Sequence, residues 1–422
     1  MNADSFHRLM KLLVDSGEAT TMEEAVNTFG NYGVRLVLDT SVEKSIPQQI
    51  IALTAINTAA RSFQGNVFIA ASSDITLLVP GFEGQRLSEF ASWAGVATNC
   101  CCNANWPVIH LGSPSENALK GRLQPWASGW SFGLGRNVVD KKVFVPAAVA
   151  AGALAVSEAF SILRKDNPYA GRRALSLSLW SMSPADESTP VDIEPELNSG
   201  LWLIGLGHLG QAYCWTLGMI DKKSPVQLVL QDTDTVTEST LTTSMLTCPA
   251  DIGRKKTRIA AEWLDARGFE TKIVERLFDS NTRVAPSDPM TALFGVDNAS
   301  ARRCCEQAGF SLVIDAGLGS GYRDFRALRM RAFPGASLAD RIWAAEPQYA
   351  NAPLAAAYQA MLSSGHEPCG VTTLATRSVG APFVGCYAAA ISIAEIFKRQ
   401  LTGKGNDVIN VNLRDPLALE LA

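Results

Sequence analysis

The sequence predicts an α/β protein with Rossmann-like parallel sheets, and two observations in its second half support this prediction. Short apolar segments alternate there with helical ones, and a glycine-rich turn joins the first apolar segment to a helix. Strands that alternate with helices form parallel sheets, because each helix returns the chain across the sheet before the next strand begins. The strands are expected at Leu201–Gly205, Gln227–Gln231, Thr271–Glu275, Ala292–Val296 and Leu312–Asp315.

The first half is predicted to be a degenerate copy of the second. Its strands are expected at Gly33–Leu38, Val67–Ala70 and Val108–Leu111, but no GxGxxG turn follows any of them. A polar stretch rich in Ser, Pro and acidic residues, Ser183–Ser199, is expected to link the halves. We therefore predict an inactive first domain at residues 1–190 and an active second domain at residues 191–422.

Two similar helices favour an internal repeat. Pro146–Phe160 and Pro382–Phe397 are both small-residue segments opened by proline, and both end in Glu-x-Phe, at Glu158 and at Glu395. Such a composition indicates a helix that packs closely against its neighbours. The apolar stretch Val143–Val156 is too short to span a bilayer, so we interpret it as buried. Two Ala-rich helices can also resemble each other by chance, and the sequence leaves that alternative open.

Composition narrows the function classes. The chain has 422 residues, 47% of them hydrophobic and 18% charged, which is enough for two domains. A net charge of −4 and a pI near 5.7 argue against a nucleic acid or a membrane as the main partner. The nine cysteines include no CxxC pair, which argues against a disulfide framework and a structural zinc site. Together with the absence of a signal-peptide pattern at the N-terminus, this predicts a cytoplasmic protein.

The glycine-rich turn predicts a nucleotide site. Gly205, Gly207 and Gly210 follow an apolar strand and open a helix, so backbone N–H groups at the helix start can approach phosphates closely. Asp232 ends the next strand, where a carboxylate can accept hydrogen bonds from ribose hydroxyls. These features do not separate NAD from ATP.

The motifs that follow separate the two nucleotides. The order D-x-D-x-V at Asp232–Val236, I-G-x-x-K at Ile252–Lys256 and a strand-end Asp297-Asn298 resembles the ThiF/MoeB and ubiquitin-activating superfamily. The resemblance covers Leu201 to the C-terminus and implies a ThiF-type adenylation fold for the second half. It implies that the three glycines, Asp232, Asp234 and Lys256 bind ATP, and that Asp297 binds Mg²⁺.

The sequence departs from the family pattern after D-x-D-x-V. Family members usually carry S-N-L-x-R-Q, whereas threonines stand here at positions 240 and 243. The resemblance implies an arginine supplied from the inactive half, and Arg61 is the candidate for contact with ATP. Arg302 and Arg303 are rivals within the second half.

A cysteine near the C-terminus is the candidate nucleophile. Cys369 lies in a Pro-Cys-Gly context that predicts an accessible, turn-rich loop near residues 360–375, and His366 is close in the sequence. Cys248 is the main competitor, whereas Cys214 and Cys386 lie within apolar helices and are expected to be inert core thiols. The surroundings of Cys369 resemble those in bacterial members encoded beside ubiquitin-like and conjugating proteins in antiphage operons.

Taken together, the resemblance implies ATP- and Mg²⁺-dependent adenylation of the C-terminal carboxylate of a ubiquitin-like protein. A thioester on Cys369 and transfer to a ubiquitin-conjugating-like enzyme would follow, in an antiviral role. Three alternatives stay open: a sulfur-carrier adenylyltransferase without a thioester step, an NAD-dependent oxidoreductase, and a non-catalytic scaffold. The oligomeric state also stays open, a homo-oligomer included.

Overall fold

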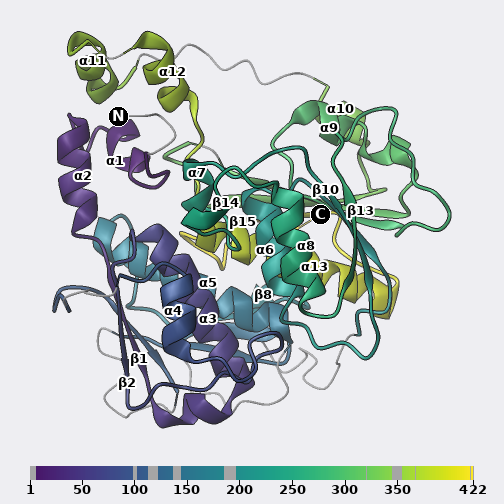
Figure 1. The fold of residues 1–422 in the computed structure, drawn as a ribbon, viewed down its shortest axis with the longest axis horizontal. Coiled ribbons are helices and arrows are strands. Elements are labelled where there is room, and N and C mark those ends of the chain that lie inside the picture. The colour runs from purple at the N-terminus through teal and green to yellow at the C-terminus, as the bar shows by residue number, and fades with distance from the viewer. Residues whose placement is uncertain are drawn as a thin grey trace.

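The computed structural model describes residues 6–97, 102–112, 122–135, 144–184, 196–319, 321–344, 354–365, 367–418 and 420–421, and at Cys369 the backbone alone. Three β-sheets surround a group of buried helices (Figure 1). The predicted α/β class with parallel sheets is confirmed.

The largest sheet has eight strands, all from the second half, in the order β11-β10-β9-β12-β13-β14-β15-β16. The strands from β11 to β13 are parallel and the remaining three are antiparallel. All five predicted strands are present, and β13 runs three residues past its predicted end because it continues to pair with β14. Their bounds are β9 Leu201–Ile204, β10 Gln227–Gln231, β11 Glu270–Val274, β12 Thr291–Phe294, β13 Leu312–Leu318, β14 Ala327–Phe333, β15 Val408–Asn412 and β16 Glu420–Leu421.

The first half forms two smaller sheets. One is parallel, in the order β2-β1-β3-β4, and contains the three strands predicted there. The other is antiparallel, in the order β5-β6-β7-β8. Their bounds are β1 Val34–Leu38, β2 Val67–Ala71, β3 Val108–Leu111, β4 Arg122–Leu123, β5 Pro125–Ser128, β6 Ser131–Leu134, β7 Leu175–Ser178 and β8 Ser183–Pro184.

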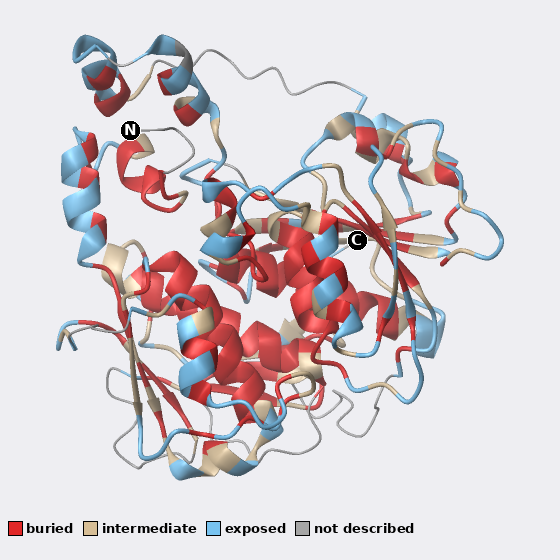
Figure 2. Ribbon diagram, in the orientation of Figure 1, coloured by how far each residue is buried: buried red, intermediate tan, exposed pale blue. Residues whose placement is uncertain are grey.

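Four helices form the buried centre of the molecule. In sequence, α3 packs on α5, α5 on α13, and α13 on α6, so that both halves contribute two helices to it (Figure 2). Helix α5 alone among the described helices is long and apolar enough to cross a membrane, and 89% of its most apolar window is buried in the fold. The α-helices are α1 Lys11–Asp15, α2 Met22–Gly30, α3 Ile46–Ser62, α4 Leu87–Trp93, α5 Val145–Arg164, α6 His208–Leu217, α7 Glu238–Leu241, α8 Lys256–Asp265, α9 Ala299–Arg303, α10 Ala339–Ile342, α11 Ala356–Ser363, α12 Pro368–Thr376 and α13 Pro382–Thr402.

The repeated helix belongs to a repeated supersecondary unit. Two antiparallel strands, a long helix and two further antiparallel strands occur in this order as β5-β6-α5-β7-β8 and again as β13-β14-α13-β15-β16. In the second copy the helices α10, α11 and α12 are inserted between β14 and α13. The Glu of each Glu-x-Phe ties down the loop that follows its helix. Glu158 accepts a hydrogen bond from the N–H of Gly171 at 3.0 Å, and Glu395 accepts one from the N–H of Asn406 at 2.7 Å.

We predict that Glu395→Ala lowers the free energy of unfolding by about 1–3 kcal/mol, because it removes a buried carboxylate that accepts from the partly buried Asn406 N–H and contacts Arg399 at 3.0 Å. Urea denaturation of the full chain measures the change. Glu270→Ala, at an exposed position of β11, is the control and should stay within about 0.5 kcal/mol. Equal stability of the two variants would contradict the structural role of the repeated glutamate.

Candidate active site

The glycine-rich turn has the geometry that its sequence predicts. Gly205 has a φ of +82°, which favours glycine, and its N–H donates to Gln231 O at 2.9 Å. A Cβ on Gly210 would collide with the carbonyl oxygen of Gly205, so the strand and helix can meet only at a glycine. Helix α6 begins just after Gly207 and has no side-chain N-cap. The first N–H groups of α6 can therefore bind an anion.

Asp232 joins this turn to the end of β10. Its Oδ2 accepts a hydrogen bond from the N–H of Leu206 at 2.6 Å, and its Oδ1 accepts one from the N–H of Asp234 at 2.7 Å. The carboxylate is thereby held at the carboxyl end of the parallel strands, where ligands of open α/β sheets bind. A carboxylate has about four acceptor positions, so capacity remains for ribose hydroxyls.

The D-x-D-x-V and I-G-x-x-K motifs pair through their backbones, which explains why they occur together. Val236 and the Gly253-Arg254 turn exchange two N–H···O bonds, each of 2.9 Å, and the N–H of Lys256 donates to Asp234 O at 3.1 Å. As a result, Lys256 Nζ lies 2.8 Å from Asp234 Oδ2. The same Nζ atom of Lys256 lies 4.0 Å from the position that a Cβ added to Gly207 would occupy. The structure thus brings the lysine, both aspartates and the glycine turn together.

Asp297 lies on the loop that follows β12, next to the same turn. A Cβ on Gly295 would be 3.0 Å from both Gly205 O and Gly210 N, so the two loops are in close contact. Asp297 itself is exposed and has no hydrogen bond or ion pair in the described part of the chain. The next residue, Asn298, caps α9 through Oδ1, which accepts from the N–H of Ser300 at 2.8 Å.

The surroundings of Asp297 fit a magnesium ion that is completed by its substrate. No group of three or more His, Cys, Asp or Glu side chains within the described ranges could hold a metal on its own. Mg²⁺ is commonly bound by one or two carboxylates together with phosphate oxygens and water. A single exposed carboxylate beside the phosphate-binding turn meets that requirement.

Arg61 crosses from the first half to the segment after D-x-D-x-V, but its guanidinium is buried. Its Nε, Nη1 and Nη2 all donate to protein acceptors. Burial lowers the pKa of Arg61 to about 10, so it stays charged at neutral pH. In this arrangement the guanidinium of Arg61 holds the segment in place, and its contact with ATP stays a prediction. The acceptors are Asn57 Oδ1 at 2.8 Å and the carbonyl oxygens of Leu241, Met245 and Thr247 at 3.0, 3.1 and 2.9 Å.

The two rival arginines differ in their surroundings. Arg302 Nε donates to Asp315 Oδ1 at 2.9 Å and its Nη2 donates to Ala316 O at 3.2 Å, so it is already paired. Burial raises the pKa of Asp315, and the charge of Arg302 opposes that shift. Arg303 is partly exposed at the end of α9.

Arg8 is a residue near the site that the sequence analysis missed. Its Cδ lies 3.6 Å from where a Cβ on Gly380 would be, at the start of the segment leading into α13. The pKa of His208, in the glycine turn, is lowered to about 4. Burial is the larger cause and the positive charge of Arg8 is the next. Arg8 stands in the N-terminal segment, which was considered only as a possible signal peptide, and no local pattern links it to the turn.

Cys369 does not lie in a turn-rich loop. It is in the first turn of helix α12, and α11 and α12 together form a helical hairpin beside the N-terminal helices (Figure 1). Tyr358 on α11 donates its hydroxyl to Asp15 Oδ1 at 2.7 Å, and Lys11 pairs with the same carboxylate. The hairpin is therefore docked on α1 of the first half. His366 and the side chain of Cys369 lie outside the described residues.

Three other cysteines, Cys248, Cys214 and Cys386, have surroundings that disfavour a nucleophilic role. Cys248 precedes a short 3₁₀ turn. The pKa of its thiol is raised, mainly by partial burial and next by its contact with Asp251. Cys214 and Cys386 are fully buried, as predicted, and burial raises the pKa of both. A raised pKa disfavours the reactive thiolate.

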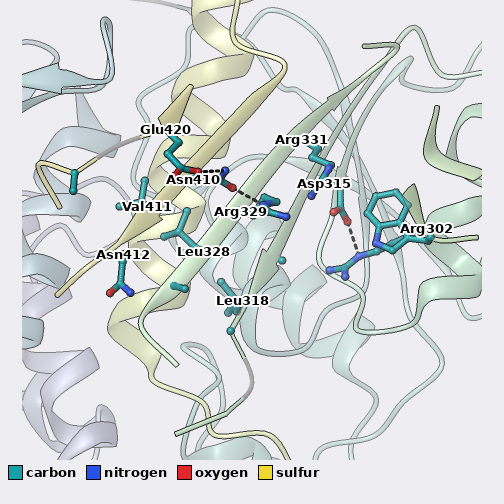
Figure 3. Close-up of a pocket in the computed structure, with 15 residues that line it drawn as sticks. Arg302, Asp315, Leu318, Leu328, Arg329, Arg331, Asn410, Val411, Asn412 and Glu420 are labelled. Atoms are coloured by element: carbon teal, nitrogen blue, oxygen red, sulfur yellow. Dashed lines mark hydrogen bonds and ion pairs between the residues drawn. The ribbon is translucent and has the colours of Figure 1, made fainter. Parts of the chain in front are cut away.

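A groove of about 440 Å³ lies on the antiparallel part of the large sheet (Figure 3). Arg329 and Arg331 line it from β14, Asp315 from β13, Asn410 from β15 and Arg302 from α9. The groove reaches α9, which begins two residues after Asp297. The residue of α9 that lines it is Arg302, five positions after Asp297 in the sequence.

Comparison with known proteins assigns the family. Models described as the BilD N-terminal domain and the BilD C-terminal domain match residues 33–179 and 197–404. The bacterial E1-like protein BilD of Collimonas sp. (strain OK412) is 37% identical over 420 residues, covering 96% of this chain and 90% of that one. The chain belongs to the BilD family of bacterial E1-like proteins.

The predicted membership of the ubiquitin-activating superfamily is thus confirmed at the level of this E1-like family. Two crystal structures of E. coli MccB, one with succinimide, are each 12% identical to the chain. They cover 71% of this chain and 94% and 91% of their own, with TM-scores of 0.38 and 0.39.

We predict that Arg61→Ala lowers the free energy of unfolding by about 2–4 kcal/mol and weakens ATP binding, because three backbone carbonyls lose a charged donor. Urea denaturation and calorimetry with ATP measure the two effects, with the exposed Arg172→Ala as control. A loss of ATP binding with unchanged stability would instead indicate a direct contact between Arg61 and the nucleotide.

We also predict that Tyr358→Phe loosens the α11–α12 hairpin, since it removes the hydroxyl donor to Asp15 but keeps the ring beside Lys11. Amide hydrogen exchange should become faster in α11 and α12 and stay unchanged in α6. Tyr169→Phe, at a position 65% exposed, serves as control. Unchanged exchange in the hairpin would show that other contacts hold it.

Proposed function

We propose that this protein uses ATP to adenylate the C-terminal carboxylate of a ubiquitin-like protein and then accepts the acyl group on Cys369. The observation that carries the proposal is the convergence of Lys256 and Asp234 on the glycine turn, with Asp232 at its base and Asp297 beside it. A dehydrogenase would have no use for the lysine or for the second exposed carboxylate. The BilD family assignment agrees with an E1-like activity.

In the first step a carboxylate oxygen of the substrate protein attacks the α-phosphorus of ATP, and pyrophosphate leaves. Two anions must approach each other, so positive charge at the reacting phosphate is the main requirement. Lys256 and the N–H groups at the start of α6 supply it. Mg²⁺ held at Asp297 would add charge on the phosphate oxygens. Asp232 would orient the ribose.

In the second step the Cys369 sulfur attacks the acyl carbon of the adenylate, a thioester forms and AMP leaves. Cys369 is in the first turn of α12. The thioester then passes to a conjugating enzyme. Since α11 and α12 are docked on α1, the first half also has a part in placing the cysteine.

We assign no nucleotide to the first half, residues 1–190. In place of a glycine turn, β1 is followed by Asp39, whose Oδ1 accepts from the N–H of Ser41 at 2.7 Å. A Cβ on Gly112, after β3, would overlap this carboxylate. A negative side chain thus occupies the loop position that a phosphate-binding turn would need. The first half instead supplies Arg61 and the dock for α11–α12 to the active second half, residues 191–422.

The test is ATP–pyrophosphate exchange with candidate ubiquitin-like proteins, using wild type, Asp297→Ala and Cys369→Ala. Asp297→Ala should reduce exchange about 100-fold or more, because it removes the metal ligand at the reacting phosphates. Cys369→Ala should keep exchange but lose a DTT-sensitive adduct with the ubiquitin-like protein. Asp340→Ala, an exposed aspartate on α10, is the control. Equal exchange in Asp297→Ala and wild type would contradict the proposal.

A further inference from the structure

The groove on the antiparallel strands has an excess of positive charge. Arg329 and Arg331 are two residues apart on β14, so both point to the face opposite α13, while Leu328 and Met330 are buried beneath (Figure 3). Arg331 pairs in register with Asp315 of β13. Arg329 pairs in register with Gly317 on one side and with Asn410 on the other. A Cβ on Gly317 would lie 3.6 Å from Arg302 Nη2, so the guanidinium of Arg302 covers the glycine.

The acidic groups in the groove are already engaged. Asp315 accepts from Arg302 at 2.9 Å, and Glu420 accepts from Asn410 Nδ2 at 3.2 Å. In the part of the chain that the structure describes, Arg331 has no hydrogen bond or ion pair, and its guanidinium lies 5.9 Å from the ring of Trp343. Burial and the charge of Arg329 lower the pKa of Arg331. The charge of Asp315, in register on β13, opposes this shift, but Asp315 makes its direct ion pair with Arg302.

The groove also has a defined direction. It extends from Arg302, in the last turn of the short helix that follows Asp297 and Asn298, to Glu420 of β16. An extended peptide lying along it would bring its last residues to the proposed adenylation site. Single-stranded nucleic acid fits less well, because such sites depend on several aromatic faces for base stacking, whereas Trp343 alone among the lining residues is aromatic.

We infer that this groove binds the extended C-terminal segment of the activated protein, and that Arg329 and Arg331 select a segment carrying an acidic side chain upstream of its terminal residue. The inference rests on the proposed function and adds the chemistry of its protein substrate. A carboxylate over Arg331 forms a charge-assisted, bidentate pair, which gives both affinity and discrimination against a basic residue in the same place.

The test uses fluorescein-labelled synthetic peptides that end in glycine and carry an acidic, a neutral or a basic residue at the upstream positions. Fluorescence anisotropy measures their binding to the full chain. Wild type should bind the acidic peptide about tenfold tighter than the neutral one and bind the basic one most weakly. Arg331→Glu should reverse the order, and Arg172→Glu, an exposed arginine outside the groove, should leave it unchanged.

Reversal of the preference is the decisive result, because a fold defect cannot create affinity for the basic peptide. Arg329→Glu is the second variant should Arg331→Glu fail to fold. Equal affinities, no measurable binding, or displacement of the acidic peptide by a single-stranded oligonucleotide would overturn the inference. Partner-dependent pyrophosphate exchange without charge preference would overturn it while leaving the proposed function intact. Charge preference without exchange would keep the groove assignment and overturn the proposed reaction.

Discussion

The candidate nucleotide site of the second half depends on one buried cation from the first half, Arg61. The segment after D-x-D-x-V lacks the Asn and Arg of related sequences, and Arg61 holds it from outside by three carbonyl hydrogen bonds. A buried guanidinium is tolerated only when its donors are satisfied, so the segment and α3 fix each other. A contact from α6 also fixes the segment, because the side-chain Oε1 of Gln211 accepts a hydrogen bond from the N–H of Leu246 at 2.9 Å. The shape of the site is therefore a property of the joined halves.

Packing between the halves makes this arrangement rigid. One continuous hydrophobic cluster includes residues from both halves. Trp215 stacks on Trp263 with ring centroids 5.6 Å apart and meets Phe82 of the first half at 5.9 Å. Arg267 lies 3.3 Å over Trp263 and donates to Gly81 O at 3.0 Å. Separation would expose these rings to water, so the halves act as one unit with a division of tasks, not as two independent domains.

The local sequence pattern predicted the strands and the motif residues of the candidate site. The other residues near that site are brought there by contacts between positions far apart in the sequence, which the pattern does not show. The strands followed from apolar runs, and Asp232 and Lys256 followed from motifs that pair through neighbouring backbone. Arg8 beside His208 and Tyr358 on Asp15 join residues hundreds of positions apart, which no periodicity records. The α12 error has a simple cause: Pro and Gly around Cys369 were interpreted as turn residues, yet proline is favoured in the first turn of a helix.

The repeated supersecondary unit bears on the meaning of the groove arginines. In the first half β6 occupies the place of β14 and has the sequence Ser-Phe-Gly-Leu, without a charged residue. A Cβ on Gly133 of β6 would collide with the carbonyl oxygen of Leu175, so backbone packing closes that surface. The same arrangement of strands and helix thus forms without arginines. Arg329 and Arg331 are therefore not required by this arrangement, which agrees with the role in binding an acidic segment that we infer for them.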